Sequence, residues 1–176
     1  MNIIKNELYA EIPNKFKTEK DKEKIKYSKY NSKYNTGDFF TDVKEVDLKS
    51  AYWETSNMKG ILTPEIYNKA QNGISKQSRL ASIGSLARKI RKLSFDGVKE
   101  YDRGIIHSEQ TEFLWDVISH EVGKVMLKAV KLAQNDYIFF WVDAIFVKSD
   151  KTVAEIVKLF ADLGYKSSVH HCEWVN

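Results

Sequence analysis

Two aspartates stand at the edges of apolar, strand-like runs that lie far apart in the chain: Asp47, within residues 46–53 (VDLKSAYW), and Asp143, within residues 139–147 (FFWVDAIFV). Carboxylate oxygens are the ligands that Mg²⁺ and similar divalent ions prefer. Phosphoryl and nucleotidyl transfer use two such ions, held between the attacking and leaving oxygens. The two aspartates therefore predict a two-metal site, although a strand-end cap or a buried ion pair with a lysine would account for each of them as well.

A basic segment lies between the two aspartates. Residues 75–92 place apolar side chains on one face of an expected helix and basic side chains on the rest. Lys76 is a candidate contact for phosphate groups, and the candidate nucleic-acid contacts on this helix are Arg79, Arg88 and Lys89. A solvated basic face explains the same pattern, so the helix alone does not assign a site.

Capping and turn signals indicate the elements that must position these residues. Residues 63–64 (Thr-Pro) are typical of a helix start, residues 72–73 (Asn-Gly) of a helix end, and residues 96–97 (Asp-Gly) of a hairpin turn. Near the end of the chain, Asp150 or Thr152 is expected to cap a helix that stops at Gly164.

The order of elements then predicts the fold class. The apolar run of residues 137–147 is rich in aromatic and β-branched residues and predicts a pair of strands. The expected order is strand 39–48, helix 49–58, helix 63–73, helix 75–92, hairpin 95–98, helix 108–134, strand pair 137–147, helix 153–163 and strand 165–169. This order predicts an α+β fold in which helices pack on one face of an antiparallel sheet.

The first 38 residues differ from the rest because lysines alternate with acids and are followed by tyrosines among serine and asparagine. They read as a solvated arm, or as a nucleic-acid arm whose lysines contact phosphates and whose tyrosines stack on bases. The expected organisation is an arm at 1–38 and one domain at 39–176, with a short insertion at about 53–92.

Composition narrows the function classes. The net charge of the 176 residues is +4, which fits a nucleic-acid or nucleotide partner without demanding one. Cys172 is the single cysteine, so no disulfide forms within the chain and a reducing compartment is expected. No run approaches the length of a membrane span, and the amino terminus lacks a signal-peptide pattern, so we expect a cytoplasmic protein without a membrane partner.

Three other kinds of site are disfavoured. Residues 170–173 (His-His-Cys-Glu) suggest zinc, but neighbours on a strand point to opposite faces and no second ligand cluster is present in the sequence. The sequence contains neither a phosphate-binding P-loop nor the glycine pattern of dinucleotide-binding folds.

The three segments, in this order, resemble the palm of family B DNA polymerases, most closely the small protein-primed and phage types. Residues 47–52 (DLKSAY) resemble the first palm motif, an Asp, two variable residues, Ser, usually Leu, then Tyr. Residues 76–84 (KQSRLASIG) resemble the fingers motif and keep its Lys and Gly. Residues 143–147 (DAIFV) resemble the second half of the third motif, with Trp141 where the family has its first Asp.

The resemblance implies a fold and roles for the matched residues. It implies a palm-like, ferredoxin-like antiparallel sheet in which Asp47 and Asp143 hold two Mg²⁺ or Mn²⁺ ions. Ser50, Lys76 and Gly84 would belong to the nucleotide site, and Tyr52 would match the steric gate that excludes a 2′-hydroxyl. The implied partners are nucleoside triphosphates, DNA as a primer or single strand, and other replication proteins.

Departures from the family leave two functions open. Leu80, Ala81 and Ile83 replace the Asn, Ser and Tyr of the fingers motif, and the chain has no room for the family's exonuclease or a full thumb. One function is metal-dependent nucleotidyl transfer to a 3′-hydroxyl in the replication of a phage or mobile element. The other is a non-catalytic nucleic-acid or replisome-binding module, or a replication initiator, on a palm scaffold. Carboxylates placed to hold ions about 3.5–4 Å apart would favour the enzyme.

Overall fold

The structure is a computed structural model that describes residues 30–32, 39–87, 90–95, 97–106 and 109–175. The chain divides into two compact units. One, the sheet unit, takes its described residues from 25–55 and 118–176. The other, the helical unit, takes its described residues from 56–117, a segment longer than the insertion expected at 53–92.

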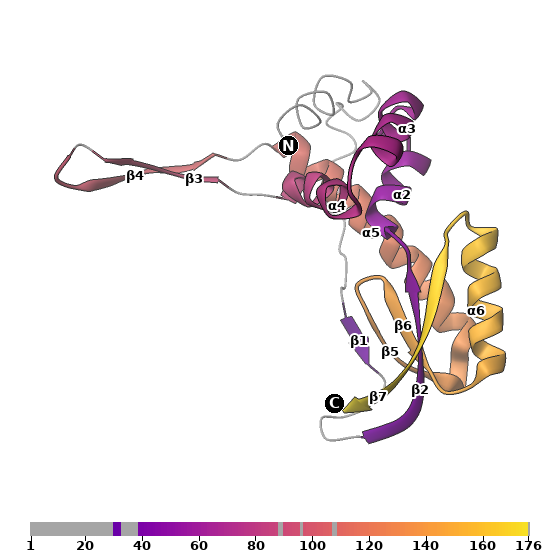
Figure 1. The fold of residues 1–176 in the computed structure, drawn as a ribbon. Helices are drawn as coiled ribbons and strands as arrows, with labels where there is room; N and C mark the ends of the chain where they lie inside the picture. Colours follow the sequence, from indigo (N-terminus) through magenta and orange to yellow (C-terminus); the bar gives the residue numbers. More distant parts are fainter. Residues whose placement is uncertain (1–29, 33–38, 88–89, 96, 107–108, 176) are drawn as a thin grey trace. The chain divides into compact units, whose positions relative to one another are not determined.

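The sheet unit is built on a five-stranded antiparallel sheet of order β1-β5-β6-β2-β7 (Figure 1). Its strands are β1 (Tyr30–Ser32), β2 (Phe39–Leu48), β5 (Tyr137–Trp141), β6 (Ala144–Val147) and β7 (Ser167–Val175). Helix α5 (Glu109–Ala133) precedes β5, and helix α6 (Asp150–Asp162) connects β6 to β7. The unit combines an antiparallel sheet with helices, so the expected α+β class is confirmed.

Helices pack on one face of this sheet. Alternate residues of the strands point to that face, among them Val46, Leu48, Phe140 and Ile145. They form one buried cluster with residues of α5 (Val122, Val125, Met126, Ala129, Ala133) and of α6 (Val153, Ile156, Phe160). Because one face is buried, a slip of one residue would expose the apolar set, so the strand register is strongly specified.

A tight turn joins β5 to β6. The register pairs Trp141 with Ala144, which leaves Val142 and Asp143 as the two turn residues. Val142 has φ 57°, in the left-handed region that glycine or asparagine normally occupies in such turns. A β-branched residue in this region is strained. The expected strand pair is therefore confirmed, but the turn lacks the usual glycine signal.

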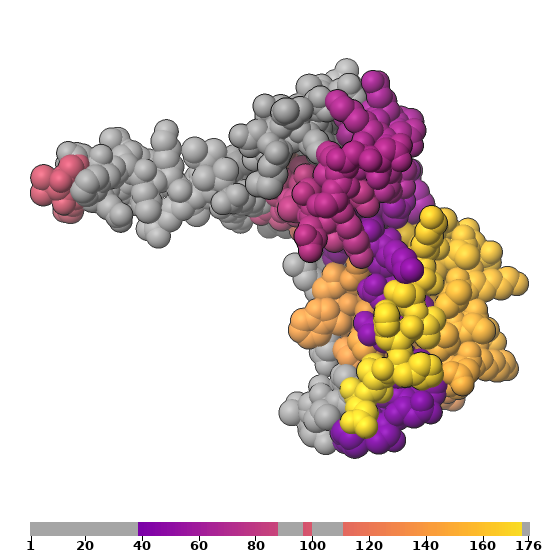
Figure 2. Space-filling model, in the orientation of Figure 1, coloured from indigo at the N-terminus to yellow at the C-terminus, as the bar shows by residue number. Residues whose placement is uncertain are grey.

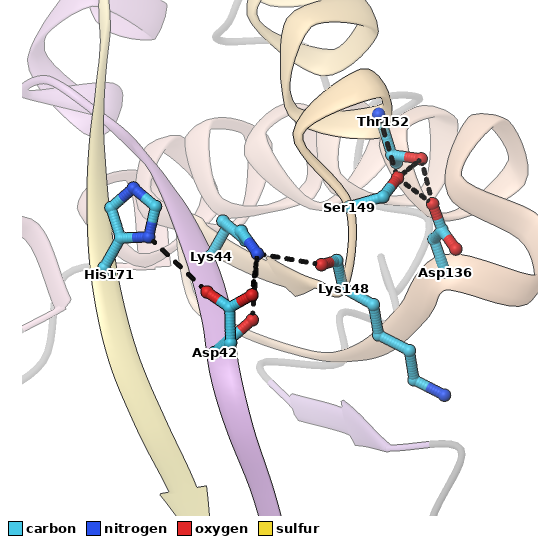
Figure 3. Close-up of polar contacts among 7 residues, drawn as sticks. All are labelled: Asp42, Lys44, Asp136, Lys148, Ser149, Thr152 and His171. Carbon is cyan, nitrogen blue, oxygen red and sulfur yellow. Dashed lines mark hydrogen bonds and ion pairs between the residues drawn. The ribbon is translucent and has the colours of Figure 1, made fainter.

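Polar contacts close the start of α6 (Figure 3). Ser149 is the N-cap and accepts a hydrogen bond from the Thr152 backbone N–H at 3.3 Å. The hydroxyls of Ser149 and Thr152 both donate to the Asp136 carboxylate. Asp150 and Thr152, the expected caps, lie inside the helix, because Ser149 has the extended backbone that a cap requires. Gly164, with φ 86°, follows the end of the helix as expected.

Figure 3 also shows a buried lysine on β2. The Lys44 side chain is 4% exposed, and its ammonium lies 2.7 Å from the Asp42 carboxylate. It also donates to the backbone carbonyls of Asp42 and Lys148, each at 3.1 Å. These contacts satisfy a charge that burial would otherwise make costly. The ion pair also lowers the pKa of the Asp42 carboxyl, with a smaller contribution from His171.

The helical unit contains the end of α2 (Ala51–Met58), α3 (Pro64–Gly73), α4 (Lys76–Gly84), the 3₁₀ turn η3 (Ser85–Ala87), and the hairpin of β3 (Ile90–Phe95) and β4 (Glu100–Ile106). Thr63 caps α3 as expected, and its hydroxyl accepts from Ile66 N–H at 3.3 Å. The hairpin expected at 95–98 is present, with Phe95 paired to Glu100.

The expected helix at 75–92 is wrong in length. Helix α4 ends at Gly84, and residues 90–95 form strand β3 instead. Glycine weakens the helix at this point, and the Ser85 hydroxyl donates to the Ser82 carbonyl at 2.7 Å, which satisfies a carbonyl that the ending helix leaves open.

Candidate functional site

Asp47, near the end of β2, and Asp143, in the β5–β6 turn, lie at the same end of the sheet. Asp47 pairs with Ala144, the residue after Asp143, and the Leu48 N–H donates to the Asp143 carbonyl at 3.0 Å. Both side chains are partly exposed. Residues separated by almost one hundred positions in sequence are thus brought together because β2 is paired with the β5–β6 hairpin.

The Asp47 side chain lies on the sheet face opposite the helix-covered core. It alternates with Val46 and Leu48, which both belong to the buried cluster on the helix side. Glu45 shares the face of Asp47, and burial followed by the charge of Asp47 raises the pKa of the Glu45 carboxyl. His170, which is paired with Glu45 on β7, acts in the opposite direction. This end of the sheet therefore concentrates negative charge that a cation would stabilise.

Trp141 is exposed on the same face as Asp47. Trp141 pairs with Ala144, and Ala144 pairs with Asp47, so the three residues form a row across three strands. The Trp141 side chain is 61% exposed, which excludes the alternative that it belongs to the core. Tryptophan therefore stands on the surface at the position where the resemblance places an acid.

Two lysines that sequence reasoning did not assign flank the acids. The Lys49 N–H donates to the Lys166 carbonyl at 2.8 Å, which places the two residues side by side between the end of β2 and the start of β7. Both residues are exposed. Lys49 lies inside the first motif and could have been selected from the sequence, whereas Lys166 reaches this end only because β7 pairs with β2.

Ser50 and Tyr52 follow Asp47 as the chain enters α2. Ser50 is partly exposed and has φ 56°, a left-handed conformation that turns the chain from the strand into the helix, and its carbonyl accepts from Glu54 N–H at 3.0 Å. Tyr52 is half-buried and packs against the core cluster of the sheet unit. The ring of Tyr52 is thus held by packing on the same segment that carries Asp47.

The remaining expected site residues belong to the helical unit. Lys76 is exposed in the first turn of α4, which Ser75 caps, and Gly84 is exposed at its end. The Arg79 guanidinium donates to the carbonyls of Ile74 at 2.6 Å and Ala70 at 3.4 Å, so it closes the end of α3. Arg88 and Lys89 lie outside the described residues.

The acid pair fits a magnesium-type ion better than a metal cage built wholly of protein. Within the part of the chain that the structure describes, no three His, Cys, Asp or Glu side chains gather as metal ligands. Mg²⁺ commonly binds through one or two carboxylates together with water and substrate phosphates. Asp47 of β2 and Asp143 of the β5–β6 turn supply that number of carboxylates, so this end of the sheet is the candidate site.

None of the helices in the described residues is both long enough and apolar enough to span a membrane.

The sequence was compared with protein-family models and with curated protein sequences. No protein-family model matches the sequence, and no curated protein sequence matches it.

Proposed function

We propose that the protein transfers nucleotides to a 3′-hydroxyl with a reduced palm domain of the family B DNA polymerase type, in the replication of phage or mobile-element DNA. The adjacency of Asp47 and Asp143 carries this proposal, because the backbone hydrogen bond between Leu48 and Asp143 joins the two segments that hold them. The resemblance predicts this pair from the sequence, and the sheet register supports it independently of the resemblance.

Each residue at the end of the sheet that carries Asp47 has its own proposed role in binding the metal ions, the nucleotide or the phosphates. Asp47 and Asp143 would hold two Mg²⁺ or Mn²⁺ ions, which neutralise charge on the attacking and leaving oxygens. Lys49 and Lys166 are exposed residues beside the end of β2 that carries Asp47, and their ammonium groups would contact the triphosphate. Ser50 contributes a hydroxyl from the segment between β2 and α2, and Tyr52 acts as the gate against a 2′-hydroxyl. Lys76 and Gly84, in the helical unit, stay proposed nucleotide contacts.

Backbone strain near the acids also supports a functional site. Val142 and Ser50 both have positive φ and lie close in sequence to one of the two aspartates, whereas Asp42 and Gln134, which also have positive φ, do not. Such conformations cost free energy and persist where the surrounding structure imposes them, and they gather at functional sites. In this protein they fix the backbone immediately before Asp143 and after Asp47.

One observation favours the second candidate, a non-catalytic nucleic-acid-binding or initiator module. Trp141, a surface aromatic that suits stacking on a base, occupies the position of an acid in the third motif. The loss of that acid affects catalysis only if the site needs a third carboxylate. The two candidates therefore differ in turnover and agree in nucleic-acid binding.

A primer-extension assay tests the proposal. A labelled single-stranded or primed DNA is incubated with nucleoside triphosphates and Mg²⁺ or Mn²⁺, using wild type, Asp47→Asn and Asp143→Asn. Each substitution removes one negative charge from the pair, so extension should fall to background in both variants. Asp162→Asn, at the exposed end of α6, is the control and should extend like wild type.

Thermal melting of each variant separates catalysis from folding. The proposal requires that Asp47→Asn and Asp143→Asn melt close to wild type. Wild type without metal-dependent extension, or an Asp47→Asn variant with full extension, would overturn the proposal. The first result, together with retained DNA binding, would favour the non-catalytic module.

A further inference from the structure

The face of the sheet that carries Asp47 also carries a flat aromatic surface at a defined position. Trp141, Ala144 and Asp47 are directly paired across β5, β6 and β2. Paired residues of antiparallel strands point to the same face, and neighbouring strands lie about 4.8 Å apart. The backbone positions of Trp141 and Asp47 are therefore two strand spacings, about 10 Å, apart.

Ala144, which lies between Trp141 and Asp47 in this row, has a small side chain. Ala144 contributes only a methyl group to the row, so no large side chain of β6 separates Trp141 from Asp47. In Figure 2, the β5–β6 hairpin (orange) reaches the surface of the sheet unit. A nucleic-acid base stacks with one of its flat faces on an aromatic ring. For a base stacked on Trp141 to react at Asp47 and Asp143, its sugar would have to extend toward these aspartates.

Other aromatic rings of this face are used in packing. Phe139 and Phe146 stack on each other with centroids 4.1 Å apart, and Phe139 is 5% exposed. They belong to a small buried cluster with Val43 and Ile138. Trp141 is 61% exposed, although it lies two residues from Phe139 on the same strand.

We infer that Trp141 binds the base of the 3′-terminal nucleotide of a single-stranded DNA by stacking, with the sugar directed along the row toward Asp47. The inference deepens the proposed function, since it names the residue that would place the 3′-hydroxyl at the acids. Lys49 and Lys166, beyond Asp47, supply the positive charge that attracts a phosphate-bearing strand to this end of the sheet.

Binding of a 5′-fluorescein-labelled deoxythymidine oligonucleotide, followed by fluorescence anisotropy in the absence of divalent ions, tests the inference. Trp141→Ala should weaken binding about five- to a hundredfold, the range that loss of one stacked base produces. Trp141→Phe should restore most of the affinity. Leu127→Ala, another exposed apolar residue but on α5, should bind like wild type.

Two further readouts distinguish stacking at the 3′ end from general adhesion. The salt dependence of binding should keep its wild-type slope in Trp141→Ala, because no phosphate contact is lost. An oligonucleotide with an abasic 3′-terminal nucleotide should bind wild type as weakly as Trp141→Ala binds the intact strand, and the two changes together should add little.

The outcomes separate this inference from the proposed function. If Trp141→Ala binds the intact strand like wild type, or if the abasic end leaves wild-type binding unchanged, stacking by Trp141 is wrong even when extension depends on Asp47. If both binding results are as expected and no variant or wild type extends DNA, the stacking stands and nucleotidyl transfer fails. Melting curves of Trp141→Ala and Trp141→Phe show whether each variant is folded.

Discussion

The positions of charged residues follow the sequence-based expectation more closely in the sheet unit than in the helical unit. In the sheet unit, Asp47 lies near the end of β2 and Asp143 in the β5–β6 turn, and the Leu48 N–H donates to the Asp143 carbonyl. In the helical unit, the long basic helix expected at 75–92 ends at Gly84, and Arg79 folds back onto the carbonyls of α3. A register fixed by a buried face specifies which residues are neighbours, whereas the periodicity of a helix does not specify where the helix ends.

Substitutions of Arg79 and Lys76 on α4 test whether the basic residues of the helical unit serve the fold or bind substrate. Arg79→Ala removes a charged donor from the carbonyls of Ile74 and Ala70, so it should lower the free energy of unfolding by about 1.5–3 kcal/mol. Lys76→Ala, at an exposed position of the same helix, should change it by less than about 0.5 kcal/mol and raise the nucleotide concentration needed for extension. Urea unfolding and extension kinetics measure both. An Arg79→Ala variant with wild-type stability and weakened DNA binding would show that Arg79 acts as a nucleic-acid contact instead.

Tyr52 tests whether one residue of the sheet unit serves both packing and substrate choice. Tyr52→Val should cost about 1–2 kcal/mol of stability, less than the full loss of a buried aromatic ring, because Tyr52 is half-buried against the core. Removing a gate also makes room for a 2′-hydroxyl, so the ratio of ribonucleotide to deoxyribonucleotide incorporation should rise. Melting temperature and the incorporation ratio are measured on the same preparation, with Tyr52→Phe as the control. A destabilised variant with an unchanged ratio would assign Tyr52 to packing alone.

The smallest expected effect concerns the cap of α6, which lies at the opposite end of β6 from Asp143. Hydrogen bonds from Ser149 and Thr152 lower the pKa of the Asp136 carboxyl. A lowered pKa stabilises the folded state above the ordinary value of 3.8, and this contribution is lost as the pH falls through the lowered pKa. Ser149→Ala should cost about 1 kcal/mol near neutral pH and should reduce this acid-dependent loss.

Urea midpoints measured from about pH 6 to pH 2 check this expectation. Ser149→Thr keeps both the hydroxyl and the cap and should follow the wild-type profile. An unchanged profile in Ser149→Ala would mean that Asp136 contributes nothing through this contact.

Local signals predicted the elements better than their ends. The pair at 63–64 and the hairpin at 95–98 were predictable because capping and turn chemistry act over a few residues. The expected caps of α6, Asp150 and Thr152, lie one and three residues after the observed cap, Ser149. All three residue types favour the cap position, and only the backbone conformation selects among them.

The site was predictable in part. Asp47 and Asp143 share a motif order and flanking apolar runs, so the sequence indicated them as a pair. Lys166 becomes a neighbour of Asp47 through the pairing of β7 with β2, and Trp141 joins the row of Asp47 through the pairing of β6 with β2. No local pattern contains either of these two pairings. The turn at Val142 could not be predicted from the sequence for a different reason. A β-branched residue rarely adopts the left-handed backbone conformation that Val142 has here.

The short strand β1 has a consequence for any shortened form of the chain. Tyr30–Ser32 pairs with β5 and so occupies the backbone groups along one edge of the sheet, the edge next to Trp141. An unpaired edge strand is a template for pairing with another molecule, and aggregation follows. A truncation made after residue 36 would remove this cover together with the lysines of the arm, so self-association could be mistaken for loss of DNA binding. A truncation that begins at residue 30 retains the edge strand and isolates the contribution of the arm.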